Sequence, residues 1–149
     1  MALSNDSEFR VALSALSLAD QRLAAAHFVE NVLPLCTDAR VRGAVTAAGR
    51  KDITDAELAA VYQAAKSASV DTFTACGKEC DWSNQAGHFV AEAALSCVTA
   101  AGASANLAWD AAMQARMART CETIAAGVGT ENREAEAQYR ILTEFLSRE

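Results

Sequence analysis

Apolar residues recur at intervals of three or four along most of this chain, and that spacing predicts amphipathic helices. In the last segment the apolar positions are Tyr139, Leu142, Phe145 and Leu146. Runs rich in valine, isoleucine and tyrosine, which are typical of strands, are absent from the sequence. The pattern therefore predicts a chain built from helices.

Start and stop signals divide the chain into about seven helices. We expect them over residues 7–16, 17–33, 38–50, 54–69, 83–101, 105–126 and 130–146, with a separate short segment over 71–79. The expected capping residues are Ser17, Asp38, Thr54, Ser83, Ser104 and Thr130. Thr54 also forms a capping box with Glu57, in which each side chain bonds the backbone amide of the other residue.

Short connections between the expected helices favour antiparallel neighbours. We predict an all-α fold, either a compact multi-helix bundle or a short helical-hairpin array, with about six to eight helices. No linker or low-complexity tract marks a second domain, so residues 1–149 are expected to form a single helical domain.

The composition supports this prediction. Hydrophobic residues make up 52% of the chain and charged residues 21%, which is ordinary for a globular domain. Alanine, the strongest helix former, is the most abundant residue. This composition excludes a β-sandwich or barrel and disfavours an α/β sheet.

The charge balance is acidic. Thirteen Lys and Arg residues stand against nineteen Asp and Glu residues, which gives a formal net charge of −6 at pH 7. Nucleic-acid binding needs a basic face that displaces counterions, and the sequence has no dense basic cluster. An acidic chain instead suits a basic protein partner.

The cysteines and the longest uncharged run bear on location. The five cysteines are odd in number and irregularly spaced, so we expect buried thiols in a reducing compartment rather than a secreted disulfide framework. The uncharged run over residues 93–109 is too short and too polar to span a bilayer. We therefore expect a cytoplasmic protein with no membrane partner.

Two histidine–glutamate pairs could hold a metal. His27 precedes Glu30 by three residues, and His88 precedes Glu92 by four, so each pair falls on one helix face. Brought together, these four side chains could bind a transition metal. The alternative is two ordinary histidines, each near an acid, because di-iron bundles place the glutamate first, in Glu-x-x-His.

Cys76 and Cys80 lie one helical turn apart and could contribute to zinc binding or form a redox pair. A structural zinc needs four ligands, and the remaining cysteines stand alone. Two partly buried thiols are the alternative, and we expect no cofactor. The motifs G-x-S-x-G, G-x-G-x-x-G and H-E-x-x-H are absent, so the sequence points to a protein that is not an enzyme.

Two further groups of residues are given structural roles. We expect Trp82, Trp109, Phe89 and Tyr62 to be core anchors rather than ligand-stacking residues. We expect the arginines of the helix over 105–126, at positions 116 and 119, to form a solvated face rather than an anion site.

Four segments carry a resemblance to a known family. Residues 28–35, F-V-E-N-V-L-P-L, resemble a helix end of the form A-E-x-V-L-P-x-F. Residues 38–49 resemble a D-x-R-x-R-x-A-I-x-A-A segment, residues 53–68 resemble the helix that follows it, and residues 86–88 match an A-G-H element. In these segments the chain resembles bacterial immunity proteins, the immunity-five-like domain of polymorphic toxin systems.

The resemblance implies a non-enzymatic binding protein that neutralises a cognate toxin by direct contact. A rigid acidic protein suits electrostatic steering towards a basic toxin domain, such as a nuclease. The acidic residues that we expect at the contact are Glu30, Asp38, Asp71, Glu79 and Asp81.

Two other functions stay open. One is the metal-binding or redox protein that would use the histidine–glutamate or cysteine pairs. The other is a self-associating structural module, a homodimer in which the amphipathic last helix packs on a second copy of the chain.

Overall fold

Seven α-helices and one short 3-10 helix form the ordered elements of the part of the chain that the structure describes, and no strand is found there. The structure is a computed structural model that describes residues 2–79 and 81–148, with the side chains of residues 77–79 excepted. The elements are α1 (Asp6–Ser14), α2 (Leu18–Glu30), η1 (Leu33–Leu35), α3 (Ala39–Ala48), α4 (Asp55–Glu79), α5 (Trp82–Cys97), α6 (Leu107–Ala125) and α7 (Glu134–Ser147). The prediction of an all-α bundle is confirmed.

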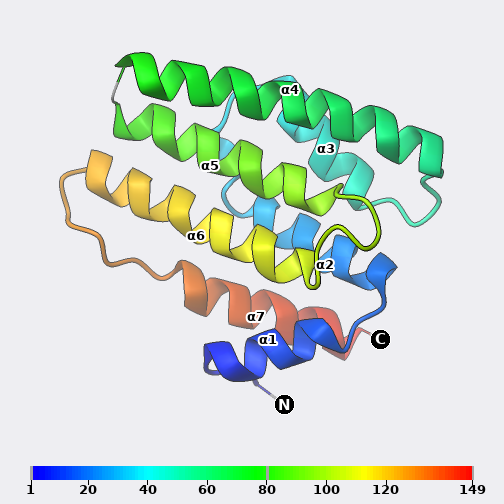
Figure 1. Cartoon of the computed structure of the whole chain (residues 1–149). Helices are drawn as coiled ribbons and strands as arrows, with labels where there is room; N and C mark the ends of the chain where they lie inside the picture. The colour runs from blue at the N-terminus through cyan, green and yellow to red at the C-terminus, as the bar shows by residue number, and fades with distance from the viewer. Residues whose placement is uncertain (1, 80, 149) are drawn as a thin grey trace.

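The helices pack in two layers (Figure 1). Helices α4, α5 and α6 lie side by side and run antiparallel, and α2 and α3 pack behind them. Helices α1 and α7 lie at the other edge of the bundle, beside α6 and α2. Helix α2 is therefore at the centre of the molecule.

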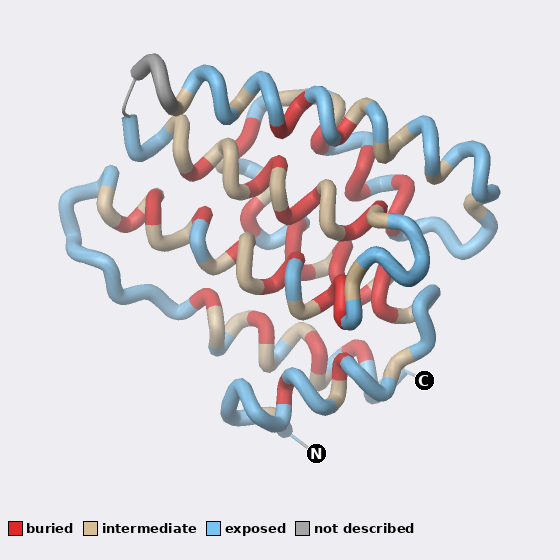
Figure 2. The backbone as a smooth tube through the Cα atoms, viewed as in Figure 1, coloured by how far each residue is buried: buried red, intermediate tan, exposed pale blue. Residues whose placement is uncertain are grey.

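Small side chains fill the core where α5, α6 and α2 meet. Fully or almost fully buried alanines include Ala93 and Ala94 of α5 and Ala111 and Ala115 of α6. A methyl group lets two helix backbones approach closely, so the alanine content explains the tight packing of this row. Figure 2 shows the buried positions concentrated on the inward sides of these helices.

Aromatic side chains anchor α1 to the bundle. Phe9 of α1 is fully buried, and its ring centroid lies 5.4 Å from that of Phe28 and 5.5 Å from that of Tyr139. Large aromatic surfaces contribute most of the burial energy that a short helix can gain. Phe9 thus packs α1 against both α2 and α7.

Three of the expected capping residues are confirmed. The Ser17 hydroxyl accepts from the amide of Asp20 at 3.1 Å, and Asp38 accepts from the amide of Arg40 at 2.9 Å. Thr54 and Glu57 form the reciprocal capping box, with distances of 3.1 and 3.2 Å. Each cap satisfies a backbone amide that the first helical turn leaves without a partner.

The other three expected caps are wrong by two or three residues. Helix α5 is capped by Asp81, which accepts from the Ser83 amide, and α6 is capped by Asn106, which accepts from the Trp109 amide. Helix α7 begins after Arg133, whose side chain makes no capping bond. In each case several Ser, Thr, Asp or Asn residues compete for the cap, and local sequence does not rank them.

The separate segment predicted over residues 71–79 is also wrong, because α4 continues without a break from Asp55 to Glu79. The predicted stop lies in a run of Ser, Val, Asp and Thr, which have modest helix propensity. In the structure the hydroxyls of Thr72 and Thr74 bond back to the carbonyls of Ala68 and Val70 within the helix. Packing against α5 keeps this stretch helical.

In the described ranges, no helix combines the length and the apolar character that crossing a membrane requires.

Candidate functional site

Exposed apolar and acidic side chains lie on the hairpin formed by α4 and α5. Phe73 is 67% exposed, Val70 56% and Trp82 44%, and the acids Asp71 and Asp81 are exposed beside them in sequence. We call these five residues the hairpin surface. Large exposed apolar side chains are typical of a protein-binding surface, where charged side chains belong to the polar rim.

Trp82 therefore lies at the surface, and its prediction as a core anchor is wrong. It is the first residue of α5, directly after the capping residue Asp81. The other three aromatics of that group, Trp109, Phe89 and Tyr62, are partly buried and pack against the core as expected.

One arginine joins two of the predicted contact acids. Arg40 Nη2 lies 2.7 Å from Asp38 Oδ2 and 2.9 Å from Asp71 Oδ2. The hydrogen bonds from Arg40 hold the pKa of Asp38 below its usual range. Helices α3 and α4 are thereby linked, and Asp71, whose side chain is 65% exposed, is the more accessible of the two acids.

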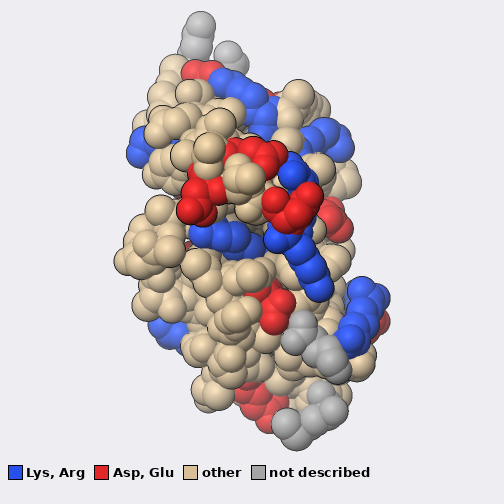
Figure 3. Space-filling view, turned by 90° about the vertical axis from the view of Figure 1, so that its right-hand side faces the viewer, with Lys and Arg blue, Asp and Glu red and all other residues tan. Residues whose placement is uncertain are grey.

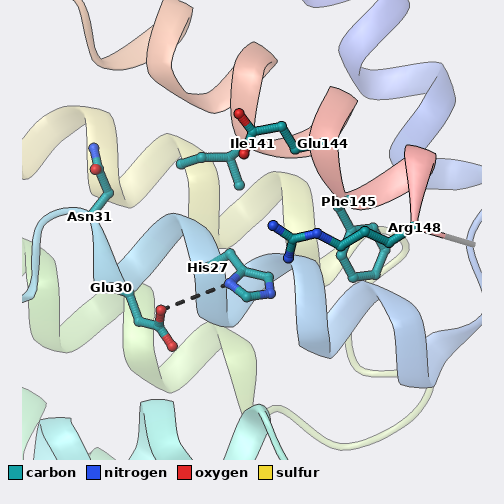
Figure 4. Close-up of a pocket in the computed structure, with 7 residues that line it drawn as sticks. All are labelled: His27, Glu30, Asn31, Ile141, Glu144, Phe145 and Arg148. Atoms are coloured by element: carbon teal, nitrogen blue, oxygen red, sulfur yellow. Dashed lines mark ion pairs between the residues drawn. The ribbon is translucent and has the colours of Figure 1, made fainter.

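Glu30 lies elsewhere, beside His27 in a pocket between α2 and α7 (Figure 4). The pocket has a volume of about 290 Å³, and His27 Nδ1 lies 3.8 Å from Glu30 Oε2 within it. Phe145 and Arg148 close the pocket from the side of α7. This predicted contact acid is therefore not part of the hairpin surface.

His88 of α5 contacts α4 next to the hairpin surface, where its ring centroid lies 5.6 Å from that of Phe73. Its Nδ1 is 2.9 Å from the Thr72 hydroxyl, and its Nε2 is 3.6 Å from Glu92 Oε1. The Thr72 hydroxyl also lies within hydrogen-bond distance of the carbonyls of Ala68 and Ser69, at 2.9 and 3.0 Å. This network fastens α5 to α4.

The two predicted histidine–glutamate pairs thus lie against different helices, His27 against α7 and His88 against α4. Among the described residues, no group of three or more His, Cys, Asp and Glu side chains could hold a metal ion. Cys80 and the side chain of Glu79 lie outside the described residues. Metal binding stays a prediction without a ligand cluster to support it.

The cysteines that the structure describes are free thiols. Cys97 is fully buried at the end of α5, and burial raises its pKa to about 12. Burial also raises the pKa of Cys76. A reactive cysteine needs the opposite shift, towards the thiolate, so neither thiol has the environment of a nucleophile.

A groove that no pattern in the sequence predicted lies at the other end of α4 from the hairpin surface. It has a volume of about 750 Å³ and lies between the first turns of α2 and α4 and the loop that joins α5 to α6. Arg22 lines this groove but is only 7% exposed, and its Nη1 donates to the carbonyl of Cys97 at 2.9 Å. We call this cavity the Arg22 groove.

A signal for Arg22 was present in the sequence. Arg22 lies four residues before Ala26 and seven before Val29, so the three residues fall on one face of a helix, and the two apolar residues predict that this face is buried. A charged residue at a position of the buried face is unusual and points to a partner or a ligand.

Arg116 and Arg119 are only partly exposed and bind carboxylates of neighbouring helices, so the prediction of a solvated face is wrong. Arg116 makes two hydrogen bonds to Asp6 of α1, at 2.8 and 3.0 Å. Arg119 bonds Glu134 of α7 at 2.9 Å. Both arginines therefore tie α6 to its neighbours.

A comparison of the chain with protein-family models, with curated proteins and with solved structures gives no match. The resemblance to immunity proteins accordingly stays a prediction from the sequence.

Proposed function

We propose that the protein is a non-enzymatic binding protein of the immunity type, which neutralises a basic toxin domain by direct contact through the hairpin surface. The observation that carries this proposal is the exposure of the large apolar side chains of Val70 and Phe73 on α4, a helix that also carries the exposed acid Asp71. The free thiols support a cytoplasmic location, where such a protein would meet its toxin.

The chemistry of the hairpin surface suits a basic partner. Aromatic and large apolar side chains supply most of the binding energy when a partner covers them, and a polar rim excludes water around them. Asp71 and Asp81 would face the lysines and arginines of the partner. The net charge of −6 would also speed the encounter of the two proteins.

The packing of two of the segments that carry the resemblance supports the same proposal. A Cβ atom at Gly87, in the A-G-H element, would lie 3.3 Å from the carbonyl oxygen of Leu35, in the V-L-P-L element. The glycine allows α5 to approach η1 at this point. The two elements therefore form one packing unit, which gives a physical reason for them to occur together.

The test uses the polypeptide encoded next to this gene, which the proposal expects to be a basic toxin. Its binding to the purified protein is measured by isothermal titration calorimetry, and rescue of growth is measured in bacteria that express it. The double variant Phe73→Ala/Asp71→Asn is expected to weaken binding about a hundredfold, because it removes an apolar anchor and an adjacent charge.

The matched control is Val128→Ala/Glu131→Gln, which also removes one exposed apolar group and one exposed acid. Val128 is 73% exposed and, like Glu131, lies in the loop between α6 and α7, which is not one of the two helices of the hairpin. The control is expected to bind and protect like the unmodified protein. Equal affinity of both double variants for the partner, or no binding by the unmodified protein, would contradict the proposal.

A further inference from the structure

Arg22 carries a buried positive charge that the protein itself does not neutralise. Among the described residues it has no carboxylate partner, and its one hydrogen bond goes to the carbonyl of Cys97. Burial lowers its pKa, but a guanidinium stays charged at neutral pH. The remaining N–H groups of Arg22 have no acceptor among the described residues, and they are not fully enclosed, so the side chain opens into the groove that it lines.

The walls of the Arg22 groove are mostly apolar. Leu18, Leu58, Tyr62 and Val98 line it, and Leu18 is 40% exposed although it is a large aliphatic residue. A groove of this size lies within the range of small-molecule sites, which combine apolar walls with a few polar groups that fix orientation. An occupant with an apolar body would cover these side chains.

The rim of the groove disfavours ions with several negative charges. Arg50 lines the rim, but Asp52 and Glu57 bind it at 3.2 and 2.8 Å, so its charge is already balanced. Asp55 adds a further carboxylate at the rim and Lys51 a cation. Figure 3 shows acidic and basic side chains mixed on this end of the molecule.

We infer that the Arg22 groove binds a small aliphatic monocarboxylate, whose carboxylate pairs with Arg22 and whose hydrocarbon chain lies on Leu18, Leu58 and Tyr62. A carboxylate matches the fork of N–H donors on a guanidinium. One negative charge balances the charge of Arg22, which has no carboxylate partner among the described residues. This site is separate from the hairpin surface, since it lies at the first turns of α4 and the surface lies in its second half.

The experiment is a titration of the ¹⁵N-labelled full chain with hexanoate, followed by NMR. We expect saturable shifts in the amides of α2, α4 and the α5–α6 loop that line the groove, and in the side-chain Nε–H of Arg22. Hexan-1-ol, which has the same chain without the charge, is expected to bind at least about tenfold more weakly. Adipate and inorganic phosphate are expected to bind more weakly than hexanoate because of the acidic rim.

Two variants locate the site. Arg22→Met keeps the apolar stem and removes the charge, so hexanoate affinity should fall about tenfold to a hundredfold. Ala59→Glu leaves Arg22 in place and puts a carboxylate in the exposed wall of the groove, where it competes for the guanidinium. The matched control is Ala60→Glu, the next residue of α4, which is exposed but does not line the groove.

Loss of binding in Arg22→Met and Ala59→Glu, with binding kept in Ala60→Glu, would support the inference. It would be overturned by the absence of saturable shifts with hexanoate, or by unchanged affinity in Arg22→Met and Ala59→Glu. Equal affinity for hexan-1-ol would overturn it too, because the groove would then be merely apolar. Phosphate or adipate binding as tightly as hexanoate would overturn the assignment to monocarboxylates.

Discussion

Arginines pack between helices at two ends of this molecule, and the groups that bind them differ. Between α6, α1 and α7, Arg116 bonds Asp6 twice and Gln138 once. Arg119 in the same region bonds Glu134 and Glu122. Around the Arg22 groove, Arg22 has a single bond to a backbone carbonyl, although it is the most buried of the three.

Arg116 and Arg119 bind carboxylates of neighbouring helices and so stabilise the fold, whereas Arg22 has no carboxylate partner among the described residues. Acids outnumber basic residues in this chain, so no shortage of carboxylates explains the environment of Arg22. A charge taken out of water is costly unless an opposite charge or hydrogen bonds compensate it. The compensation around Arg116 and Arg119 is internal, and we have proposed that around Arg22 it comes from a ligand.

The largest effect on this comparison is expected from Glu134→Gln. Glu134 is 3% exposed and accepts from Arg119 at 2.9 Å and from the Asn31 amide at 2.8 Å. A glutamine replaces one of the two carboxylate oxygens with an NH₂ group, so in the same position it turns donors towards one of the two partners. We expect the free energy of unfolding in urea to fall by about 2 kcal/mol.

Glu131→Gln is the matched control for that measurement, because Glu131 is an exposed acid three residues before Glu134, in the loop that precedes α7. Its change should stay within about 0.5 kcal/mol. A loss of the same size in both variants would mean that the cost comes from overall charge, and the paired role of Arg119 would be wrong.

The helical fold and the number of helices could be predicted because periodicity, alanine content and capping boxes are local signals. The capping box of Thr54 and Glu57 is confirmed for this reason. The extension of α4 through Thr72 could not be predicted, because its contact with His88 of α5 depends on tertiary packing. Local propensity predicts an end of that helix at residue 69, whereas in the structure packing against α5 keeps the chain helical beyond it.

The candidate sites were harder to predict than the fold. Asp38 and Asp71 were both predicted as contact residues, but only the structure shows that Arg40 binds both. Asp71 lies 31 residues after Arg40 in the sequence. Arg119 was assigned to solvent because its partner Glu134 lies on another helix. Arg22 could have been noticed from its place on a buried stripe, whereas the groove that it lines is made by three separate segments.

A smaller effect is expected from Asp6→Asn. The Arg116 hydrogen bonds lower the pKa of Asp6, so the ionised form is favoured in the folded protein. Asp6 is about half exposed, and solvent screening limits the expected loss at pH 7 to about 1 kcal/mol or less. Urea unfolding of both proteins measures this difference.

The difference in stability between the unmodified protein and Asp6→Asn is expected to depend on pH. A lowered carboxyl pKa stabilises the folded state above the ordinary value of about 4, and the contribution is lost as the pH falls through the lowered value. The stability gap between the unmodified protein and Asp6→Asn should therefore be constant near neutrality and close in acid. A gap that stays unchanged at acid pH would show that Asp6 contributes without its charge.

The smallest effect on stability is expected from Arg22→Met, although Arg22 is more buried than either Arg116 or Arg119. The substitution leaves the Cys97 carbonyl without its side-chain donor, which costs stability, and it removes an uncompensated buried charge, which restores stability. We expect a net change within about 1 kcal/mol in urea unfolding without ligand. Arg116→Met, which breaks the bonds to Asp6 and Gln138, should lose more. If Arg22→Met instead destabilised the protein more than Arg116→Met, Arg22 would be a structural cap of α5, and the contrast between the two ends of the molecule would fail.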